Sequence, residues 1–340
     1  MDDPAMLSAY DEYYGRVSRA QVARIAAISG LRPASVLDVG SGPGPVSLAF
    51  AELGARTFSL VDSSERALEK ARLSLARFAD SPGAPLSVST AVADIESLEA
   101  IPDGGFDLVA FGHCLNEVGR GDDRVGRRLA IARRAARAVA PGGAALVMDP
   151  ATLAASRDSI ALRDALLAEG WTVRAPCTFP GPCPALAAGP TQTCHDEAPW
   201  DVPPEVGRLA SEAGLDRDLI KMSWFILSPP PRRAEALPGE AEPRPSGGAY
   251  RVVSMPMLNK GGRVRYLLCG PGGRFPFSAR RDDEAARAGG FFSLGRYELI
   301  SVDEPEPREG GWGFGARTAI RRLGSLAHAG RDGIGCSDVR

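Results

Sequence analysis

The feature that most constrains this chain is a glycine-rich turn between a short apolar stretch and an amphipathic one. Residues 35–39 (Ser-Val-Leu-Asp-Val) have the apolar character of a buried strand, and residues 40–45 (Gly-Ser-Gly-Pro-Gly-Pro) follow at once. A helix is expected directly after the turn, because proline suits the first turn of a helix. This order usually binds a nucleotide-containing ligand, since the backbone approaches it closely and free helix N–H groups donate to it.

Strand-like and helix-like segments then alternate through the first half of the chain. Such alternation predicts a mostly parallel sheet with helices on both faces, the Rossmann-like α/β class. One or two helices are expected within residues 5–29, and Pro141-Gly142-Gly143 is expected to stop a long helix ahead of the fifth strand. The further strands are expected at 57–62, 86–93, 106–111, 144–148 and 222–227, and the helices at 46–53, 64–78, 124–139 and 204–213.

Changes in composition along the chain predict several segments. Short strand-like runs at 250–254, 264–268 and 291–299, separated by glycine-rich turns, predict a small β domain after the α/β domain. The segments are N-terminal helices (1–30), the α/β domain (31–227) with a Cys-rich segment (174–200), a Pro-rich linker (228–249), the small basic β domain (250–302) and a weakly patterned tail (303–340).

Overall composition excludes several classes of protein. The 340 residues are 44% hydrophobic and 24% charged, so a sizeable core can be buried. The net charge of −2 is not that of a polycation held on nucleic acid or membrane by bulk charge. No apolar run approaches the ~20 residues of a membrane helix, and the acidic start is not a basic signal sequence. We therefore expect a cytoplasmic bacterial protein, monomeric and without membrane contact.

The spacing of the glycines indicates which ligand the turn binds. A dinucleotide fingerprint would place its third glycine where this chain has Pro45, whereas the third glycine here is Gly44. The stretch Leu37–Gly44 resembles motif one of class I S-adenosylmethionine (SAM) methyltransferases. That resemblance implies that Asp62, at the end of the second strand, accepts the ribose hydroxyls and that Asp94 reads the adenine amine. The implied cofactor residues are Asp38, Gly40, Ser41, Gly42, Gly44, Asp62 and Asp94.

The loop after the fourth strand carries no recognisable catalytic motif. Methylation of an exocyclic base nitrogen usually needs Asn/Asp-Pro-Pro-aromatic there, but residues 112–117 read Gly-His-Cys-Leu-Asn-Glu. His113 and Glu117 are weak candidates for a general base, with Asn116 beside them. The competing interpretation is a loop histidine and a helix-start glutamate. An enzyme and a binding protein that retains its cofactor site therefore both stay open.

Three cysteines lie in a Pro- and Gly-rich stretch that cannot build a core of its own. Cys177, Cys183 and Cys194 are separated by five and ten residues, whereas structural zinc sites usually begin with a closer pair. Disulfides are disfavoured in a reducing cytosol. Iron–sulfur clusters take four thiolates, and Cys269, at a predicted strand end, is the natural fourth, with His195 as the alternative.

The other interpretations of the cysteines involve no metal. Cys114 follows the fourth strand and is expected to be a small buried residue, and Cys336, in a Gly-rich tail, is expected to have no role. A Pro-Cys pair is also the nucleophile of cytosine-5 methyltransferases, which is an alternative for Cys177 or Cys183.

Taken together, these motifs resemble those of one family. The chain resembles the methyltransferase-like assembly factors of the mitochondrial small ribosomal subunit and their bacterial Rsm-type relatives, over roughly residues 5–270. The resemblance rests on Leu37–Gly44, residues 115–118 (Leu-Asn-Glu-Val), Asp149-Pro150 and the cysteine spacing from Ala175 to His195. It implies a 4Fe-4S cluster whose ligands are Cys177, Cys183, Cys194 and Cys269.

The segment from Arg244 to Arg281 predicts a site for RNA. It contains eight basic residues and no Asp or Glu, so its local charge is strongly positive. The interleaved aromatic residues are Tyr250, Tyr266, Phe275 and Phe277. A small β domain of this kind can hold single-stranded RNA by phosphate contact and stacking, unless the aromatics form its core and the arginines a solvated face. The predicted contacts are Arg251, Lys260, Arg263, Arg265, Arg274, Arg280 and Arg281.

The function favoured by these patterns is that of a SAM-binding, methyltransferase-like protein with a 4Fe-4S cluster. The resemblance implies small-subunit rRNA, or an assembly intermediate of the small ribosomal subunit, as its partner. Two alternatives are an inactive assembly factor that keeps cofactor and cluster as structural groups, and a small-molecule methyltransferase.

Overall fold

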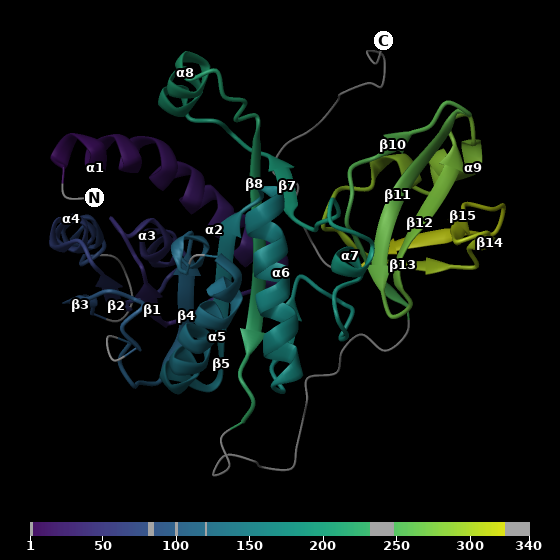
Figure 1. Cartoon of the computed structure of the whole chain (residues 1–340). Coiled ribbons are helices and arrows are strands. Elements are labelled where there is room, and N and C mark those ends of the chain that lie inside the picture. Colours follow the sequence, from purple (N-terminus) through teal and green to yellow (C-terminus); the bar gives the residue numbers. More distant parts are fainter. Residues whose placement is uncertain (1–2, 81–84, 99–100, 120, 232–247, 324–340) are drawn as a thin grey trace.

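A computed structural model of the chain contains two eight-stranded sheets that lie side by side (Figure 1). It describes residues 3–80, 85–98, 101–119, 121–231 and 248–323. The first sheet consists of β1 (Ser35–Val39), β2 (Thr57–Asp62), β3 (Ser87–Val92), β4 (Phe106–Gly112), β5 (Val139–Pro150), β6 (Thr172–Ala175), β7 (Asp196–Pro199) and β8 (Leu219–Ser228). Among the described residues, no helix has the length and apolar character needed to cross a membrane.

The first sheet has the doubly wound order β3-β2-β1-β4-β5-β8-β6, with β7 paired to β8. Strands β1 to β5 are parallel, and β8 is antiparallel to β5, β6 and β7. Because β1 lies between β2 and β4, the chain changes direction across the sheet at this point. Ligands of such sheets bind outside the carboxyl ends of the strands that flank this switch point.

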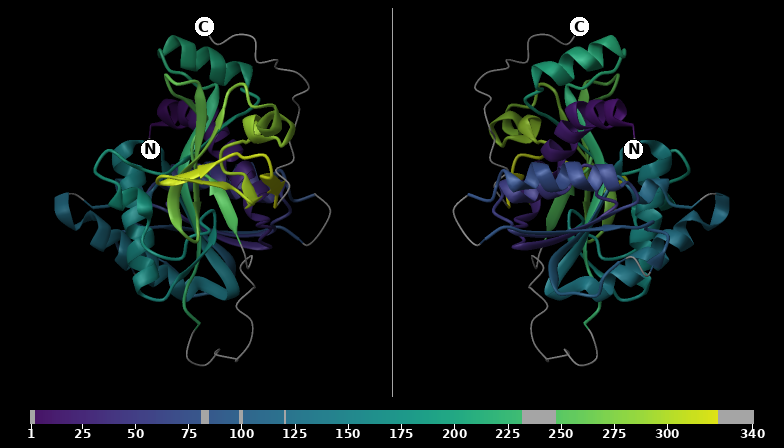
Figure 2. Two further views of the ribbon diagram at one scale, coloured as in Figure 1. Left: turned by 90° about the vertical axis from the view of Figure 1, so that its right-hand side faces the viewer. Right: turned by 90° about the vertical axis from the view of Figure 1, so that its left-hand side faces the viewer.

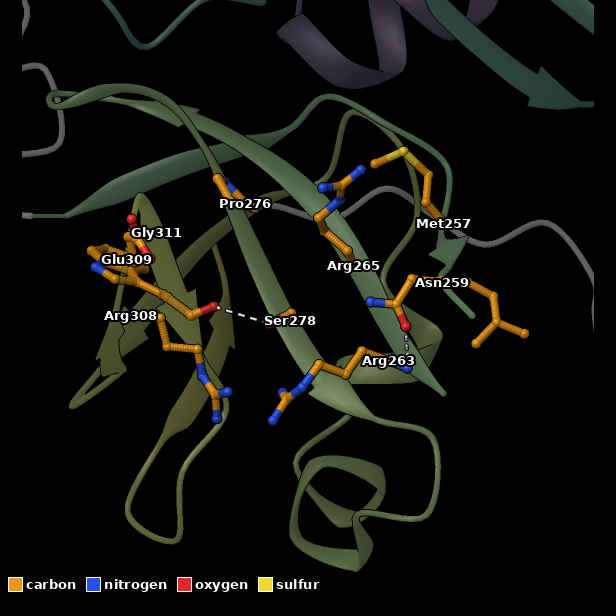
Figure 3. Close-up of a pocket in the computed structure, with 11 residues that line it drawn as sticks. Met257, Asn259, Arg263, Arg265, Pro276, Ser278, Arg308, Glu309 and Gly311 are labelled. Carbon is orange, nitrogen blue, oxygen red and sulfur yellow. Dashed lines mark hydrogen bonds between the residues drawn. The ribbon is translucent and has the colours of Figure 1, made fainter. Parts of the chain in front are cut away.

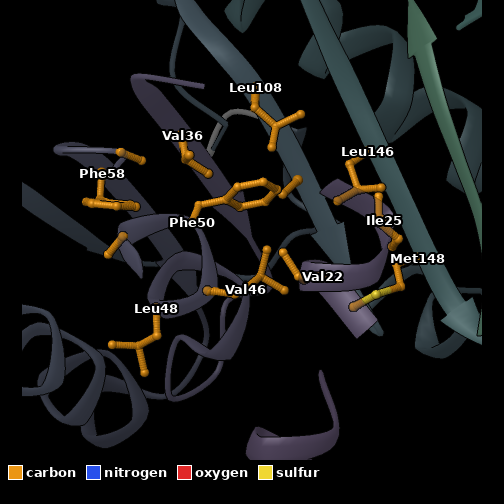
Figure 4. Packing of buried hydrophobic residues seen from close by; sticks show 14 of the residues in the cluster. Val22, Ile25, Val36, Val46, Leu48, Phe50, Phe58, Leu108, Leu146 and Met148 are labelled. Atoms are coloured by element: carbon orange, nitrogen blue, oxygen red, sulfur yellow. The ribbon is translucent and has the colours of Figure 1, made fainter. Parts of the chain in front are cut away.

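Helices cover both faces of the first sheet, as the alternation of the sequence predicts. On β4, Leu108 and Ala110 pack toward α2 (Arg16–Ser29), α3 (Pro45–Glu52) and α4 (Glu65–Ala76). Val109 and Phe111 pack toward α5 (Arg124–Ala135) and α6 (Leu153–Ala168) on the other face. In Figure 4, Phe50 of α3 lies among side chains of the first core. The helical elements here are α1 (Pro4–Tyr10), the π-helical turn η1 (Asp11–Gly15), α2 (Arg16–Ser29), α3 (Pro45–Glu52), α4 (Glu65–Ala76), η3 (Leu115–Glu117), η4 (Gly121–Asp123), α5 (Arg124–Ala135), η5 (Ala136–Ala138), α6 (Leu153–Ala168), α7 (Pro184–Ala187) and α8 (Pro204–Glu212).

The second sheet has its own hydrophobic core and lies beside α6 and α7 (Figures 1 and 2). Its order is β14-β15-β12-β11-β9-β13-β16, with β10 paired to β11. Its elements are β9 (Ala249–Val252), β10 (Met257–Leu258), β11 (Arg263–Gly270), β12 (Gly273–Arg280), α9 (Glu284–Ala288), η6 (Phe291–Ser293), β13 (Leu299–Asp303), β14 (Glu306–Arg308), β15 (Gly311–Gly313) and β16 (Ala319–Arg322). Tyr266 and Phe277 are fully buried in this core, so these two aromatics pack the sheet and are not available to stack on a base.

The boundaries of the second sheet differ from the prediction. The run 291–299 is not a strand: Phe291 is buried in the core at the start of a 3-10 turn, and the strand begins only at Leu299. Residues 306–322, predicted to be a weakly patterned tail, contain β14, β15 and β16. Strands of three or four residues separated by glycines leave too little apolar alternation to be recognised. The predicted linker lies mostly outside the described residues, as does Cys336.

Two further differences concern the first sheet. The helix predicted over 124–139 ends at Ala135, and β5 already begins at Val139. Pro141-Gly142-Gly143 therefore lies inside β5, at the point where the register with β4 shifts. Glycine is required there, because Gly142 has a φ of 75°.

Candidate functional site

The glycine-rich turn is folded tightly against two neighbouring strand ends. Gly40, Gly42 and Gly44 have φ values of 68°, 52° and 80°, a region that side chains other than glycine rarely adopt. The N–H groups of Gly40 and Ser41 donate to the carbonyl of Val61 at 2.8 and 3.1 Å, which ties the turn to β2. A Cβ on Gly40 would lie 2.5 Å from the Cβ of Cys114. The turn is therefore fixed from both sides of the switch point.

Asp62 lies where a ribose-binding acid is expected. One carboxylate oxygen accepts a hydrogen bond from the N–H of Gly42 at 2.7 Å, and the other accepts from the N–H of Ser64 at 2.9 Å. The side chain is half-buried at the end of β2. Each carboxylate oxygen has more than one acceptor position, so two sugar hydroxyls can still donate to this fixed group.

Asp38 is buried beneath the turn, with 1% of its surface exposed. One oxygen accepts from the hydroxyl of Ser47 at 2.6 Å and from its N–H at 3.2 Å, which braces the start of α3. The other oxygen has no partner among the described residues. Burial raises the pKa of Asp38 to about 6. A cationic amino group, such as the one on the methionine half of SAM, would satisfy the free oxygen.

Asp94 follows β3 at the same edge of the sheet, and its side chain is exposed. One of its oxygens accepts from the N–H of Glu96 at 2.9 Å in a tight turn. The next residue, Ile95, approaches the position of a Cβ on Gly40 to 3.8 Å. The structure thus brings the predicted adenine-reading segment to the glycine-rich turn.

Of the candidate bases after β4, His113 is held in the framework. Its φ of 60° is left-handed, and its ring Nε2 lies 2.7 Å from the side-chain oxygen of Gln21 on α2. Burial lowers the pKa of His113 to about 4, so the ring is neutral at neutral pH. The histidine fixes the loop to α2 through this contact.

Asn116 also faces inward, whereas Glu117 is exposed. The backbone N–H of Asn116 donates to Asp149 at 3.2 Å, and its amide, in the orientation that satisfies both of its ends, donates to Asp149 and to the carbonyl of His113. Arg128 of α5 is buried, and it donates to the carbonyl of Asn116 at 3.3 Å. Glu117 is therefore the one predicted candidate whose side chain faces solvent.

Asp149→Asn should change how stability depends on pH. Burial raises the pKa of Asp149 from its ordinary 3.8 to about 6. The folded state therefore binds this proton more tightly than the unfolded state does. The protonated carboxyl contributes to the free energy of unfolding below about pH 4, and this contribution is lost as the pH rises through about 6. The full cost of ionisation is about 3 kcal/mol. About half of this cost is already incurred at pH 5, so the stability of the variant relative to wild type should rise by about 1.4 kcal/mol between pH 5 and pH 8 in urea unfolding; an unchanged difference would contradict it.

The N-terminal helices, predicted without a role, cover the cofactor edge (Figure 1). Residues 41–44 are buried, and Asp11 pairs with Lys70 of α4 at 3.1 Å. The phenol of Tyr10 lies near Glu117 and Asp62, and burial, together with these carboxylates, raises its pKa to about 12. Only tertiary packing brings Tyr10 to this place, so no local signal in the sequence marks it.

The four predicted cluster cysteines come together between the two sheets. Cys177, Cys183 and Cys194 lie on loops beside α6, and Cys269 is on β11. The hydroxyl of Thr178 donates to the carbonyl of Cys269 at 2.9 Å. Burial, and then the neighbouring thiolates, raise the pKa values of Cys183 and Cys269, and burial raises the pKa of Cys177 to about 12. We call this group of four thiols the cysteine cradle.

Among the described residues, no three His, Cys, Asp or Glu side chains are arranged to hold a single metal ion. A cubane cluster makes a different demand, because each thiolate binds a different iron atom and the sulfurs lie further apart. All four cradle cysteines are free, and the buried Nε–H of Arg163, on the helix beside them, has no partner in the described part of the chain. His195 faces Glu197, at 3.7 Å, which argues against it as the fourth ligand. Four neighbouring thiols without disulfides are the kind of donor set that a 4Fe-4S cluster requires.

The basic residues of the second sheet divide into two groups. Arg251 was predicted to contact RNA, but it is buried and donates to the carbonyls of Pro176 and Tyr297 at 2.9 and 2.7 Å. It therefore ties the second sheet to the cysteine segment. Arg274 is half-buried and reaches the carbonyl of Thr193 at 3.5 Å. Arg263 is also half-buried. The exposed residues are Lys260, Arg265, Arg280 and Arg281, and Arg280 pairs with Asp282.

A groove of about 210 Å³ lies beside two of these arginines (Figure 3). Arg263 and Arg265 line it from β11, with Met257 and Leu258 from β10 and Trp312 from β15. Leu258 is 54% exposed, which is unusual for a large apolar side chain. The groove thus joins positive charge to an apolar surface.

Comparison with known proteins gives a match for about a third of the chain. Residues 36–143 match the sequence profile of a methyltransferase domain. This segment contains the glycine-rich turn, Asp62, Asp94 and the loop after β4. This part of the chain is therefore similar to a methyltransferase domain, and the first sheet has the class I SAM-dependent methyltransferase fold, as the resemblance of the first motif implied. The match does not extend to the cysteine cradle or to the second sheet.

Solved structures of methyltransferases are also similar, though more distantly. They include the mitomycin 7-O-methyltransferase MmcR (26% identity, 40% of this chain and 37% of that chain, TM-score 0.31) and an O-methyltransferase family protein from Burkholderia thailandensis (16%, 66% and 59%, 0.37). TehB from Haemophilus influenzae is another (15%, 62% and 62%, 0.38). The matches span less than two thirds of these chains, and TM-scores this low identify neither substrate nor partner. A comparison with curated protein sequences gives no match.

Proposed function

We propose that this protein is a SAM-dependent methyltransferase that acts on RNA of the small ribosomal subunit and carries a 4Fe-4S cluster in the cysteine cradle. The observation that carries the proposal is the position of Asp62, held by the N–H groups of Gly42 and Ser64 at the switch point. A carboxylate fixed beside a glycine-rich turn is what a nucleoside with two free hydroxyls requires. The free oxygen of Asp38 supports the same ligand.

The proposed reaction assigns separate tasks to the exposed and buried residues. Bound SAM supplies an electrophilic methyl group: an RNA nitrogen or oxygen bonds to its carbon, the carbon–sulfur bond breaks, and sulfur keeps the electron pair. Glu117 is the carboxylate at this edge that can accept the proton released by the nucleophile. Tyr10 lies over the same edge and excludes water. His113 and Asn116 hold the loop that presents Glu117.

The cluster is proposed as a link between the two sheets. Three of its ligands would come from loops beside the first sheet and Cys269 from the second. A short segment rich in proline and glycine has little apolar surface of its own to bury, so a cross-link contributes much of its stability. Arg251 supports this arrangement, because it joins the second sheet to the carbonyl of Pro176, next to Cys177.

The end of β11 that carries Arg263 and Arg265 is proposed as the RNA contact. Tyr266 and Leu268 point into the core, so the alternate positions Arg263 and Arg265 point outward, beside the groove. Neither guanidinium has an acidic partner at ion-pair distance among the described residues. Arginine binds phosphate, and an apolar groove accepts the face of a base.

Transfer of a radiolabelled methyl group tests the activity. The wild-type protein is incubated with labelled SAM and small ribosomal subunits from cells that lack it, and label is expected in the RNA of the subunit. Asp62→Ala should transfer none. If the wild type binds both SAM and the subunits yet transfers no label, the activity is excluded and the chain is a binding factor. Label recovered only in small molecules would also contradict the proposal.

Direct RNA binding tests the contact surface. The double variant Arg263→Gln/Arg265→Gln should bind single-stranded small-subunit RNA at least tenfold more weakly, with a shallower dependence on salt, because two phosphate contacts are lost. The control is Arg317→Gln, an exposed arginine of the same sheet that pairs with Glu304 at 3.1 Å. Equal affinities in the two variants would exclude this face.

A further inference from the structure

Arg163 of α6 is buried against the first cysteine loop. Its side chain is 1% exposed, which is rare for arginine. Its two terminal nitrogens donate to the carbonyls of Gly181 and Phe179 at 2.7 and 2.8 Å. Both carbonyls lie in the loop that joins Cys177 to Cys183. The guanidinium thus fixes this loop in two directions at once.

Two further residues of α6 also hold the cysteine loops. Asp164 pairs with Arg163 and accepts from the backbone N–H of Cys183 at 2.9 Å. Two turns earlier, Arg157 donates to the carbonyls of Gly189 and Gln192, in the loop between the second and third cysteines. Positions 157 and 164 are seven residues apart and lie on one face of the helix. One face of α6 therefore holds both cysteine loops.

Arg163 differs from Arg157 because its charge is close to the thiols. Its guanidinium interacts with the thiols of Cys177 and Cys183, whereas Arg157 contacts only backbone carbonyls. The Nε–H of Arg163 is buried and has no partner among the described residues. The carboxylate of Asp164 is 19% exposed, so solvent screens it more than the guanidinium. The guanidinium therefore places a buried positive charge close to the thiols, beside its partner carboxylate.

We propose that Arg163 is a positioning residue for the cluster, which fixes the Cys177–Cys183 loop through its paired hydrogen bonds and raises the reduction potential of the bound cluster through its charge. The inference rests on the proposed 4Fe-4S cluster. A cluster on four thiolates is anionic, and reduction adds one more negative charge. A buried cation nearby stabilises the reduced form more than the oxidised form, because the interior screens charges poorly.

The test uses the full-length protein, purified or reconstituted without oxygen. Redox titration followed by electron paramagnetic resonance gives the potential, and the rate of iron loss to a chelator reports the fit of the loops. Arg163→Gln should shift the reduced-to-oxidised ratio about tenfold toward the oxidised form, which is about 59 mV for one electron. It should also lose iron several-fold faster. Arg163→Lys keeps the positive charge but loses the planar guanidinium that makes the paired hydrogen bonds. Its reduction potential should stay close to that of wild type, but it should lose iron faster.

Arg157→Gln is the matched control, because it loses hydrogen bonds to a cysteine loop but no charge beside the thiols. It should lose iron faster at an unchanged potential. A wild-type potential in Arg163→Gln would overturn the charge role, and an equal shift in Arg157→Gln would mean that loop distortion alone moves the potential. If Arg163→Gln binds no iron, the reduction potential of Arg163→Lys tests the role of the charge instead. A potential far from that of wild type would overturn that role. A wild-type protein without iron would instead refute the cluster itself, which is a separate result.

Discussion

Gly40→Ala should destabilise the protein by about 2–5 kcal/mol. A side chain at a φ of 68° costs about 1–2 kcal/mol, and the new Cβ would lie 2.5 Å from the Cβ of Cys114, an overpacking that costs about 1–3 kcal/mol more. Cys114 is buried, and its thiol donates to the carbonyl of Val39 at 3.1 Å, so it cannot move aside freely. Urea unfolding followed by circular dichroism measures the loss.

Gly30→Ala separates the two costs. Gly30 ends α2 with a φ of 73°, nearly that of Gly40, but nothing lies within 4 Å of a Cβ built on it. This control should lose only the backbone term, about 1–2 kcal/mol. Adding Cys114→Gly to Gly40→Ala should recover part of the loss, since it removes the atom that clashes. Equal destabilisation of Gly30→Ala and Gly40→Ala would show that the turn is not packed as described.

Cys177→Ser and Cys269→Ser should each abolish the iron content of the protein. Wild type purified without oxygen is expected to contain about four irons and four sulfides per chain. Replacing one ligand from either sheet should leave less than about one iron and remove the visible absorption, because a buried serine is a poor ligand for iron. Iron and sulfide analysis with the absorption spectrum measures both.

Cys114→Ser is the control for the cluster. It changes a buried cysteine that lies at the glycine-rich turn and not in the cysteine cradle, so its iron content should equal that of wild type. One zinc per wild-type chain, or iron that persists in Cys269→Ser, would contradict the cluster with these four ligands.

The first sheet could be predicted because its signals are local. β1 and β2 begin and end at the predicted residues, since each is an apolar run with a polar or glycine boundary. Helix α6 escaped prediction because Ser156, Ser159 and Arg163 occupy buried positions where an amphipathic helix normally has apolar side chains. These polar residues are buried because they bind the cysteine loops and Asp149, and such partners lie far away in the sequence.

The residues of the candidate site also fall into two groups: those that local sequence signals predict, and those whose role depends on contacts with distant parts of the chain. Asp62 and the glycines follow from the order of strand, turn and helix, and the structure places them together. Arg251 was assigned to RNA because charge is visible in the sequence, but burial against distant carbonyls is not. Tyr10 and Arg163 carried no signal, because each acts through contacts that exist only in the folded chain.

The most direct test of the cofactor site is a calorimetric titration of SAM into the folded protein. We predict one site per chain, with a dissociation constant in the micromolar range. Asp62→Ala, which loses the acceptor for the ribose hydroxyls, should bind at least tenfold more weakly, a loss of about 1.4 kcal/mol or more. A wild-type protein with an intact circular dichroism spectrum that binds no SAM at about 1 mM would contradict the proposed function.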